Sequence, residues 1–188
     1  MIGMFSDADK KQLLDLAKAS IQYGLEHGNV ITITLGNYPA HLQETRACFV
    51  TLHIATELRG CIGSLEAHKP LVVDIADNAY AAAFRDPRFG PLDEKEYPQL
   101  QYHISVLNPP EPLSFKSEQD LLKQIRPGID GLVLSDHGHR GTFLPSVWES
   151  LPTAKEFLSH LKQKAGLPIT YWSDTLTVDR YTVESIEE

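Results

Sequence analysis

The chain has 188 residues, of which 42% are hydrophobic and 22% are charged, and its net charge is −8. This length and composition are typical of one globular domain that buries a core of its own. Lysine and arginine form no cluster, which argues against nucleic acid as a partner. No apolar stretch approaches the ~20 residues of a membrane helix, and the first residues lack the basic and apolar regions of a signal peptide.

The two cysteines, Cys48 and Cys61, form neither a Cys-x-x-Cys pair nor a zinc-binding spacing. We therefore expect reduced thiols and a cytoplasmic protein. The sequence contains no glycine-rich phosphate loop, no Gly-x-Ser-x-Gly motif and no His-Glu-x-x-His motif. No cofactor is predicted.

Helix signals recur along the chain. Ser6 and Asp9 form a capping pair that is followed by apolar residues at helical spacing. Pro70 suits the first turn of a second helix, and Pro87 ends that helix. The sequence predicts four helices, over residues 6–28, 70–86, 117–125 and 153–165.

Strand signals fall between these helices. Residues 48–54 alternate in polarity, and a second strand at 58–65 follows closely enough to form a hairpin. Helices mixed with hairpins favour an α+β fold with a largely antiparallel sheet and flanking helices. The proline-rich segment 108–112 is the most linker-like, and a second lobe is expected to begin there. Further strands are expected over 102–107, 131–135, 141–144 and 175–183.

The segment 58–63 reads Leu-Arg-Gly-Cys-Ile-Gly. Residues two apart in a strand share a face, so we expect Arg59, Cys61 and Gly63 on one side. A guanidinium beside a thiol favours the thiolate, which is the reactive form. Glycines let a ligand or another backbone come close. The pattern indicates a nucleophilic or ligand-binding cysteine.

A structural role for Cys61 is the alternative, because free cysteine is often buried as a small hydrophobic residue. The register of the hairpin separates the two readings. A two-residue loop places Cys61 on the face of Val50, which is expected to be core. A three-residue loop places it opposite Thr51, on the face expected to carry a site. The turn at 55–57 contains neither glycine nor asparagine, so both registers stay open.

Three other polar groups are candidates. Asp86 and Arg88 lie just past a predicted helix end, where they form either a turn with a local salt bridge or a site in which Asp86 orients Arg59 or Arg88. His53 is either a site histidine or part of the polar face of a strand. The stretch Asp136-His137-Gly138-His139 occupies a predicted hairpin tip without further ligands at the usual spacing, so no metal site is predicted.

These residues also resemble a known family. The segment 58–63 is similar to the signature of the AMMECR (AMME chromosomal region) domain family, called AmmeMemoRadiSam system protein A in microbes. The resemblance implies a single domain over 1–188 with an α+β fold, a larger lobe, a smaller lobe at about 108–167, and a cleft between them. Further segments that fit the family pattern, in the expected order, are 49–52, 86–92, 104–107, 142–147 and 164–166.

The resemblance implies partners but no reaction. Microbial members resemble components of a system that includes a Memo-like protein, similar in fold to class III extradiol dioxygenases, and a radical SAM protein. Where microbial relatives often carry an acidic residue, this chain has His103. That difference weakens any mechanism that requires a carboxylate there, whereas an imidazole can serve as acceptor or base.

Three functional hypotheses follow, of which the third is a metal protein that uses His53, His103 and the 137–139 hairpin tip. In the first, the cleft binds a small anionic or carbonyl-bearing ligand, with Cys61 as nucleophile or acid–base group and Arg59 stabilising negative charge. In the second, the protein is a non-catalytic binding or adaptor module for the Memo-like protein. The catalytic candidates are Cys61, Arg59, Asp86 and His103. The ligand-binding candidates are Gly60, Gly63, Arg88 and His53, with backbone N–H groups of 60–63 as donors to an oxyanion.

Overall fold

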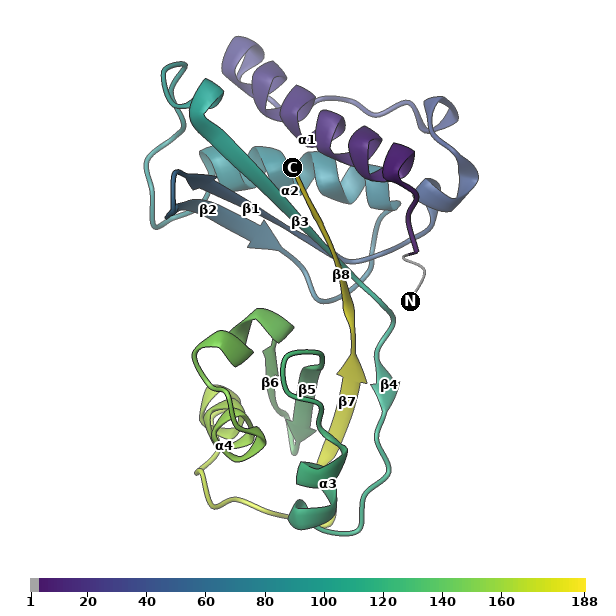
Figure 1. Cartoon of the computed structure of the whole chain (residues 1–188), viewed down its shortest axis with the longest axis vertical. Helices are drawn as coiled ribbons and strands as arrows, with labels where there is room; N and C mark the ends of the chain where they lie inside the picture. The colour runs from purple at the N-terminus through teal and green to yellow at the C-terminus, as the bar shows by residue number, and fades with distance from the viewer. Residues whose placement is uncertain (1–3) are drawn as a thin grey trace. The chain divides into compact units, whose positions relative to one another are not determined.

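The structure, a computed structural model, describes residues 4–188 and divides the chain into two compact units. The first unit comprises the residues up to Leu107 together with Glu184–Glu188, and the second comprises Asn108–Val183. Each unit has a four-stranded sheet and helices of its own (Figure 1). The predicted α+β class with antiparallel pairing is confirmed. The predicted cleft between two lobes stays a prediction.

The first unit contains two helices and a sheet of strand order β2-β1-β3-β8. The helices are α1 (Asp7–His27) and α2 (Leu71–Phe84). The strands are β1 (Cys48–Ile54), β2 (Glu57–Gly63), β3 (Leu100–Leu107) and β8 (Val183–Glu187). Single 3₁₀ turns lie at Leu35–Asn37, Ala40–Gln43 and Tyr97–Gln99.

Both helices begin where the sequence predicts. The Asp9 N–H donates to the Ser6 hydroxyl at 3.1 Å, and the Ser6 N–H donates to the Asp9 carboxylate at 2.9 Å. This reciprocal pair satisfies two N–H groups that the first turn leaves free. Gly28 ends α1 in the left-handed conformation, with φ of 70°, which glycine adopts at little cost. Pro70 directly precedes α2.

One face of the first sheet packs against α1 and α2 and forms the core of this unit. Fully burying each large aliphatic side chain there contributes about 1.5–3 kcal/mol. The buried sheet residues include Cys48, Val50, Leu52, Tyr102, Ile104 and Val106. Because side chains alternate along a strand, the opposite face carries the partly exposed residues Thr51, His53, Cys61 and His103. We call this opposite face the open face.

The second unit has a sheet of strand order β4-β7-β5-β6. Its strands are β4 (Glu111–Pro112), β5 (Gly131–Asp136), β6 (His139–Phe143) and β7 (Thr177–Tyr181). Its helices are α3 (Glu118–Gln124) and α4 (Ala154–Lys164), with a 3₁₀ turn at Pro145–Glu149. Thr153 caps α4 by accepting the Glu156 N–H at 3.2 Å, as the sequence predicts.

A separate core stabilises the second unit. Its buried residues include Leu121, Leu132, Leu134, Trp148, Phe157 and Leu161. The single strand expected over 175–183 is instead two strands, since β7 joins this sheet and β8 joins the sheet of the first unit. Across residues 4–188, no helix combines the length and the apolar character that crossing a membrane requires.

Candidate functional site on the open face of the first sheet

The loop of the β1–β2 hairpin has two residues, 55–56, because Ile54 pairs with Glu57. Ala55 adopts a φ of 55°, which is the left-handed conformation that such a tight turn requires. If every following residue of β2 paired with the preceding residue of β1 without a shift, this loop would place Cys61 opposite Val50, in the core. The observed pairing is different.

A β-bulge in β2 changes the register. The pairs on either side of the shift are His53–Leu58 and Leu52–Gly60. Arg59 is therefore an extra residue with no partner of its own on β1, and every later residue of β2 moves by one position. The result is that Cys61 pairs with Thr51, so its side chain lies on the open face. The reading of Cys61 as a core residue is thus excluded by the bulge.

Cys61 and Thr51 contact each other through their side chains. The Cys61 Sγ lies 3.1 Å from the Thr51 Oγ1, and either atom can be the donor. The thiol is only partly buried. On the other side of β1, Thr51 pairs with His103 of β3. Cys61, Thr51 and His103 therefore form one row across three strands, with Thr51 in the middle.

Asp86 and Arg88 cover the outer edge of β2 at Cys61. The Cys61 N–H donates to the Asp86 Oδ2 at 2.9 Å, and the Arg88 Nη2 donates to the Cys61 carbonyl at 3.4 Å. An edge strand exposes such backbone groups to unwanted pairing. Here two side chains satisfy them, so the loop that follows α2 fixes the backbone of Cys61.

Asp86 and Arg88 also pair with each other. The Arg88 Nε and Nη2 donate to the two Asp86 carboxylate oxygens at 3.0 and 2.7 Å. The carboxylate is 2% exposed, whereas the Arg88 side chain is 54% exposed. Hydrogen bonds from Arg88, followed by those from the Cys61 and Arg88 backbone, hold the pKa of Asp86 well below its usual range. Asp86 thus orients Arg88, one of the two arginines predicted for it.

The Arg59 guanidinium binds a different acid, Glu96. Its Nε and Nη2 donate to the two Glu96 carboxylate oxygens at 2.7 and 3.0 Å, and Nη2 also donates to the Gly90 carbonyl at 3.0 Å. Its Nη1 is buried without a hydrogen-bond partner. The Glu96 carboxylate raises the pKa of Arg59. The guanidinium that touches Cys61 therefore belongs to Arg88.

The two glycines of the motif make room for the chain itself. A Cβ atom on Gly60 would lie 2.1 Å from the Ala82 carbonyl oxygen of α2, and one on Gly63 would lie 2.4 Å from the Cys48 carbonyl oxygen. Both distances are too short for any other residue. The glycines thus admit a neighbouring backbone, which is one of the two roles predicted for them.

The two candidate histidines differ in their surroundings. His103 has a buried Nε2 without a hydrogen-bond partner, so this nitrogen retains an unused donor or acceptor. His53 lies opposite Leu58 at the start of the bulge, two residues from Thr51 on the same face. His103 is therefore the histidine of this row of three residues that keeps unsatisfied hydrogen-bonding capacity.

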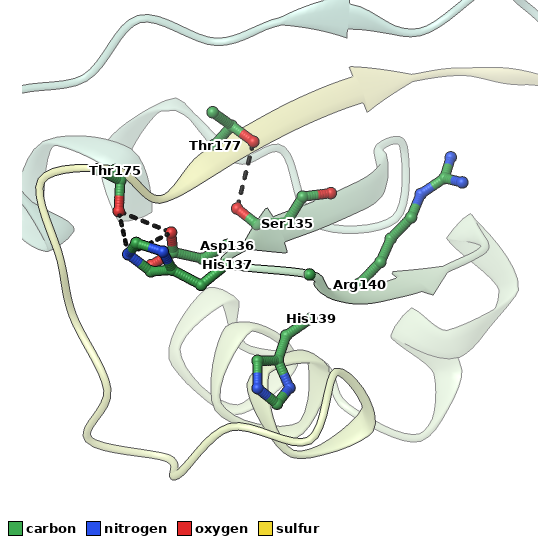
Figure 2. Close-up of a pocket in the computed structure, with 8 residues that line it drawn as sticks. Ser135, Asp136, His137, His139, Arg140, Thr175 and Thr177 are labelled. Atoms are coloured by element: carbon green, nitrogen blue, oxygen red, sulfur yellow. Dashed lines mark hydrogen bonds and ion pairs between the residues drawn. The ribbon is translucent and has the colours of Figure 1, made fainter.

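A separate cavity of about 570 Å³ lies at the β5–β6 turn of the second unit (Figure 2). Its acid, Asp136, accepts hydrogen bonds from the hydroxyls of Ser173, Thr175 and Tyr171 at 2.6–2.7 Å. Led by the Ser173 bond, these contacts lower the pKa of Asp136 to about 2. Asp136 ties the 171–175 segment to the turn, which is a structural role.

The two histidines of this turn do not converge. His137 points towards Thr175, with its Nε2 3.0 Å from the Thr175 hydroxyl (Figure 2). His139 points to the other side of the turn, where its Nδ1 lies 3.0 Å from the Ala165 carbonyl. Within residues 4–188, no three His, Cys, Asp or Glu side chains are grouped closely enough to hold a metal ion.

Sequence reasoning missed two parts of this arrangement. Glu96, the partner of Arg59, lies 37 residues further along the chain, and no local pattern connects them. The contact between Asp86 and the Cys61 backbone is equally non-local. Thr51 carried a usable signal, since the alternation of 48–54 places it on the polar face of its strand.

Comparison with known proteins gives a consistent result over nearly the whole chain. A family model described as AMMECR1 matches residues 14–186. Protein MJ0810 of Methanocaldococcus jannaschii is 36% identical over 164 residues, covering 83% of this chain and 80% of that protein. A protein of Thermotoga maritima is 41% identical over 149 residues, covering 78% of this chain and 80% of its own length.

A solved structure shares the fold. The crystal structure of the uncharacterized protein PH0010 from Pyrococcus horikoshii superimposes with a TM-score of 0.85 at 32% sequence identity. The match covers 96% of this chain and 92% of that one. The α+β architecture described above is therefore shared with an experimentally determined structure.

Proposed function

This chain belongs to the AMMECR1 family, and from that premise we propose that its open face binds a small anionic or carbonyl-bearing molecule and acts on it through the Cys61 thiol. None of the three relatives described above carries a name that assigns a reaction. The support for the proposal comes from the side chains of the site, because fold alone does not determine function.

The contact between Cys61 and Thr51 carries the proposal. A partly exposed thiol lies 3.1 Å from a hydroxyl that can donate a hydrogen bond to the thiolate. Hydrogen bonds to a charged acceptor are about twice as strong as neutral ones, so the hydroxyl favours the reactive form. The Arg88 guanidinium at the Cys61 carbonyl adds positive charge beside the same residue.

This arrangement suits reversible addition to a carbonyl group. The sulfur forms a bond to the carbonyl carbon, and the electron pair of the broken π bond moves to the oxygen. The thiol proton then ends on that oxygen, with the Thr51 hydroxyl as the carrier, since a hydroxyl both donates and accepts. His103, with its unused Nε2, is the second acid–base candidate.

Cys48 supplies an internal control. It is fully buried, its Sγ lies 3.1 Å from the Asp74 carboxylate, and burial raises the pKa of its thiol well above the ordinary value. Cys48 therefore represents an unreactive structural cysteine in the same unit, which every labelling experiment on Cys61 can use for comparison.

The test is alkylation of the native protein by iodoacetamide across a pH series, with mass spectrometry to separate the two cysteines. We expect Cys61 to react in the folded protein and Cys48 to react only after denaturation. Thr51→Val should slow the labelling of Cys61 by about threefold to tenfold, because the thiolate loses a hydrogen-bond donor. Thr51→Ser keeps the hydroxyl and should react like the unmodified protein.

A second function is favoured by the Arg59–Glu96 ion pair. Because this guanidinium binds both oxygens of a carboxylate of its own chain, it serves as a structural element of the motif, and an adaptor module with no turnover needs no more from it. The partner of that module would be a Memo-like protein. Calorimetric titration of the purified chain with a purified Memo-like protein tests this reading. Binding that persists after Cys61→Ser, together with a Cys61 that resists iodoacetamide, supports the adaptor over the thiol function.

A further inference from the structure

We infer that Arg88 selects the ligand of Cys61, and that this ligand carries a carboxylate within a few bonds of its electrophilic carbon. The inference rests on the proposed thiol function and names the substrate class for it. It also assigns to Arg88 the charge-recognition role that the sequence pattern suggested for Arg59.

The Arg88 guanidinium is held in place on one side and free on the other. Nε and Nη2 donate to Asp86, whose carboxylate is almost fully buried. No partner of Arg88 Nη1 occurs among residues 4–188, and more than half of the side chain is exposed. Because Nη2 also donates to the Cys61 carbonyl, the donors that remain are the two N–H groups of Nη1, and a guanidinium fixed in this way presents them in a defined direction to a carboxylate.

The distance to the thiol fits a small molecule. The Arg88 Nη2 lies 3.4 Å from the Cys61 carbonyl oxygen. Within one cysteine residue, bond lengths keep the carbonyl oxygen and the sulfur within about 5 Å of each other, so the guanidinium lies within roughly 8 Å of the sulfur. A carboxylate on Arg88 therefore leaves an adjacent carbon within reach of the thiol.

Arg59 cannot perform this role in the observed structure. Its side chain is 12% exposed and binds both oxygens of Glu96. The protein as a whole carries a net charge of −8, which repels anions at long range. Recognition of an anionic ligand therefore requires a local exposed cation, and Arg88 is the one that contacts Cys61.

Iodoacetate and iodoacetamide are a matched pair of probes for this inference. Both alkylate a thiolate: a sulfur electron pair forms the new S–C bond, iodide leaves with the C–I pair, and the thiol proton goes to solvent. Only iodoacetate carries a carboxylate next to the reacting carbon. Two anions repel each other, so a thiolate without a neighbouring cation reacts more slowly with iodoacetate.

The experiment measures the ratio of the iodoacetate rate to the iodoacetamide rate at Cys61, with the unfolded chain as reference. We expect the ratio in the folded protein to exceed the reference by about fivefold, as one exposed ion pair allows. Arg88→Gln should abolish the excess and Arg88→Lys should retain part of it. Arg85→Gln, which removes an exposed arginine stacked on Tyr80, should leave the ratio unchanged.

The outcomes separate this inference from the proposed function. If Cys61 reacts but shows no excess for iodoacetate, or if the excess survives in Arg88→Gln, the inference is overturned and the thiol function stands. If native Cys61 reacts with neither reagent, the proposed function fails as well. If Arg88→Gln folds poorly, a sodium chloride series on the unmodified protein tests the inference instead. The excess of the iodoacetate ratio must fall as salt screens the attraction between Arg88 and the carboxylate of iodoacetate, and an excess that does not change with salt overturns the inference.

Discussion

The Asp86 carboxylate accepts the Cys61 N–H at 2.9 Å and thereby occupies the position that a further strand would take beside β2. The same carboxylate binds Arg88 through two hydrogen bonds. One acid thus fixes both the backbone of the candidate nucleophile and the cation beside it, and its removal should affect stability and labelling together.

Replacing Asp86 tests this coupling. Asp86→Asn should lower the free energy of unfolding at pH 7 by about 2 kcal/mol, because bonds to a charged acceptor are lost. Arg88 holds the pKa of Asp86 below its unfolded value, so this stabilisation is present above about pH 4 and is lost as pH falls. Urea unfolding from pH 7 to pH 3 measures it. A stability difference that stays constant over this range would contradict the assignment, and Asp15→Asn, at an exposed helix pair, serves as the control.

The hairpin turn should become more stable with glycine. Ala55 holds a φ of 55°, a conformation that costs a residue with a Cβ atom roughly 1–2 kcal/mol. Ala55→Gly removes that cost but adds freedom to the unfolded chain, so we expect a net gain of about 0.5–1 kcal/mol in thermal or urea unfolding. Ala67 is an exposed loop residue without a positive φ, so Ala67→Gly should give no gain in the free energy of unfolding.

Gly60 should tolerate no side chain. The Cβ of alanine at this position would lie 2.1 Å from the Ala82 carbonyl oxygen, and neither backbone can move without separating β2 from α2. We expect Gly60→Ala to destabilise the protein by about 3 kcal/mol or more, at the upper end of overpacking effects. Gly36→Ala meets nothing within 4 Å and should change stability little. Equal effects of the two substitutions in urea unfolding would refute the packing argument.

Lys162 and Glu118 should respond in opposite ways to neutralisation. The Lys162 side chain is fully buried, and its ammonium lies 2.7 Å from the Glu118 carboxylate. Glu118→Gln removes the carboxylate that neutralises this buried charge and leaves the Ile169 carbonyl as its acceptor, so we expect a loss of about 1–3 kcal/mol. Lys162→Met removes the desolvated charge at similar volume and should be neutral or stabilising. Thermal unfolding of both variants measures this contrast, which a large loss in Lys162→Met would disprove.

The elements of the fold were largely predictable because their signals are local. Ser6, Thr153 and Gly28 mark helix ends through contacts within a few residues, and the structure confirms each. The break between β7 and β8 was not predictable, since the choice of sheet depends on partners far away in the sequence.

The site shows the same division. Alternation correctly placed Thr51 on the polar face, but hairpin register depended on a bulge at Arg59 that no residue type announces. The expected alternation of side chains along β2 is therefore interrupted between Arg59 and Cys61 by this bulge. Two acids position the arginines near Cys61: Asp86 holds Arg88, and Glu96 binds Arg59. These acids lie 25 and 37 residues from their partners in β2, Cys61 and Arg59, so no local pattern predicts the contacts.

The last strand of the first unit comes from the far end of the chain. The second unit, Asn108–Val183, is continuous, whereas the first needs residues 184–188 to supply β8 and the buried Ile186. During synthesis on the ribosome, the inserted unit therefore emerges in full before the unit that surrounds it can close its sheet. The unit that carries Cys61 therefore completes its sheet second, and one edge of its strand β3 stays unpaired until residues 183–187 have been synthesised.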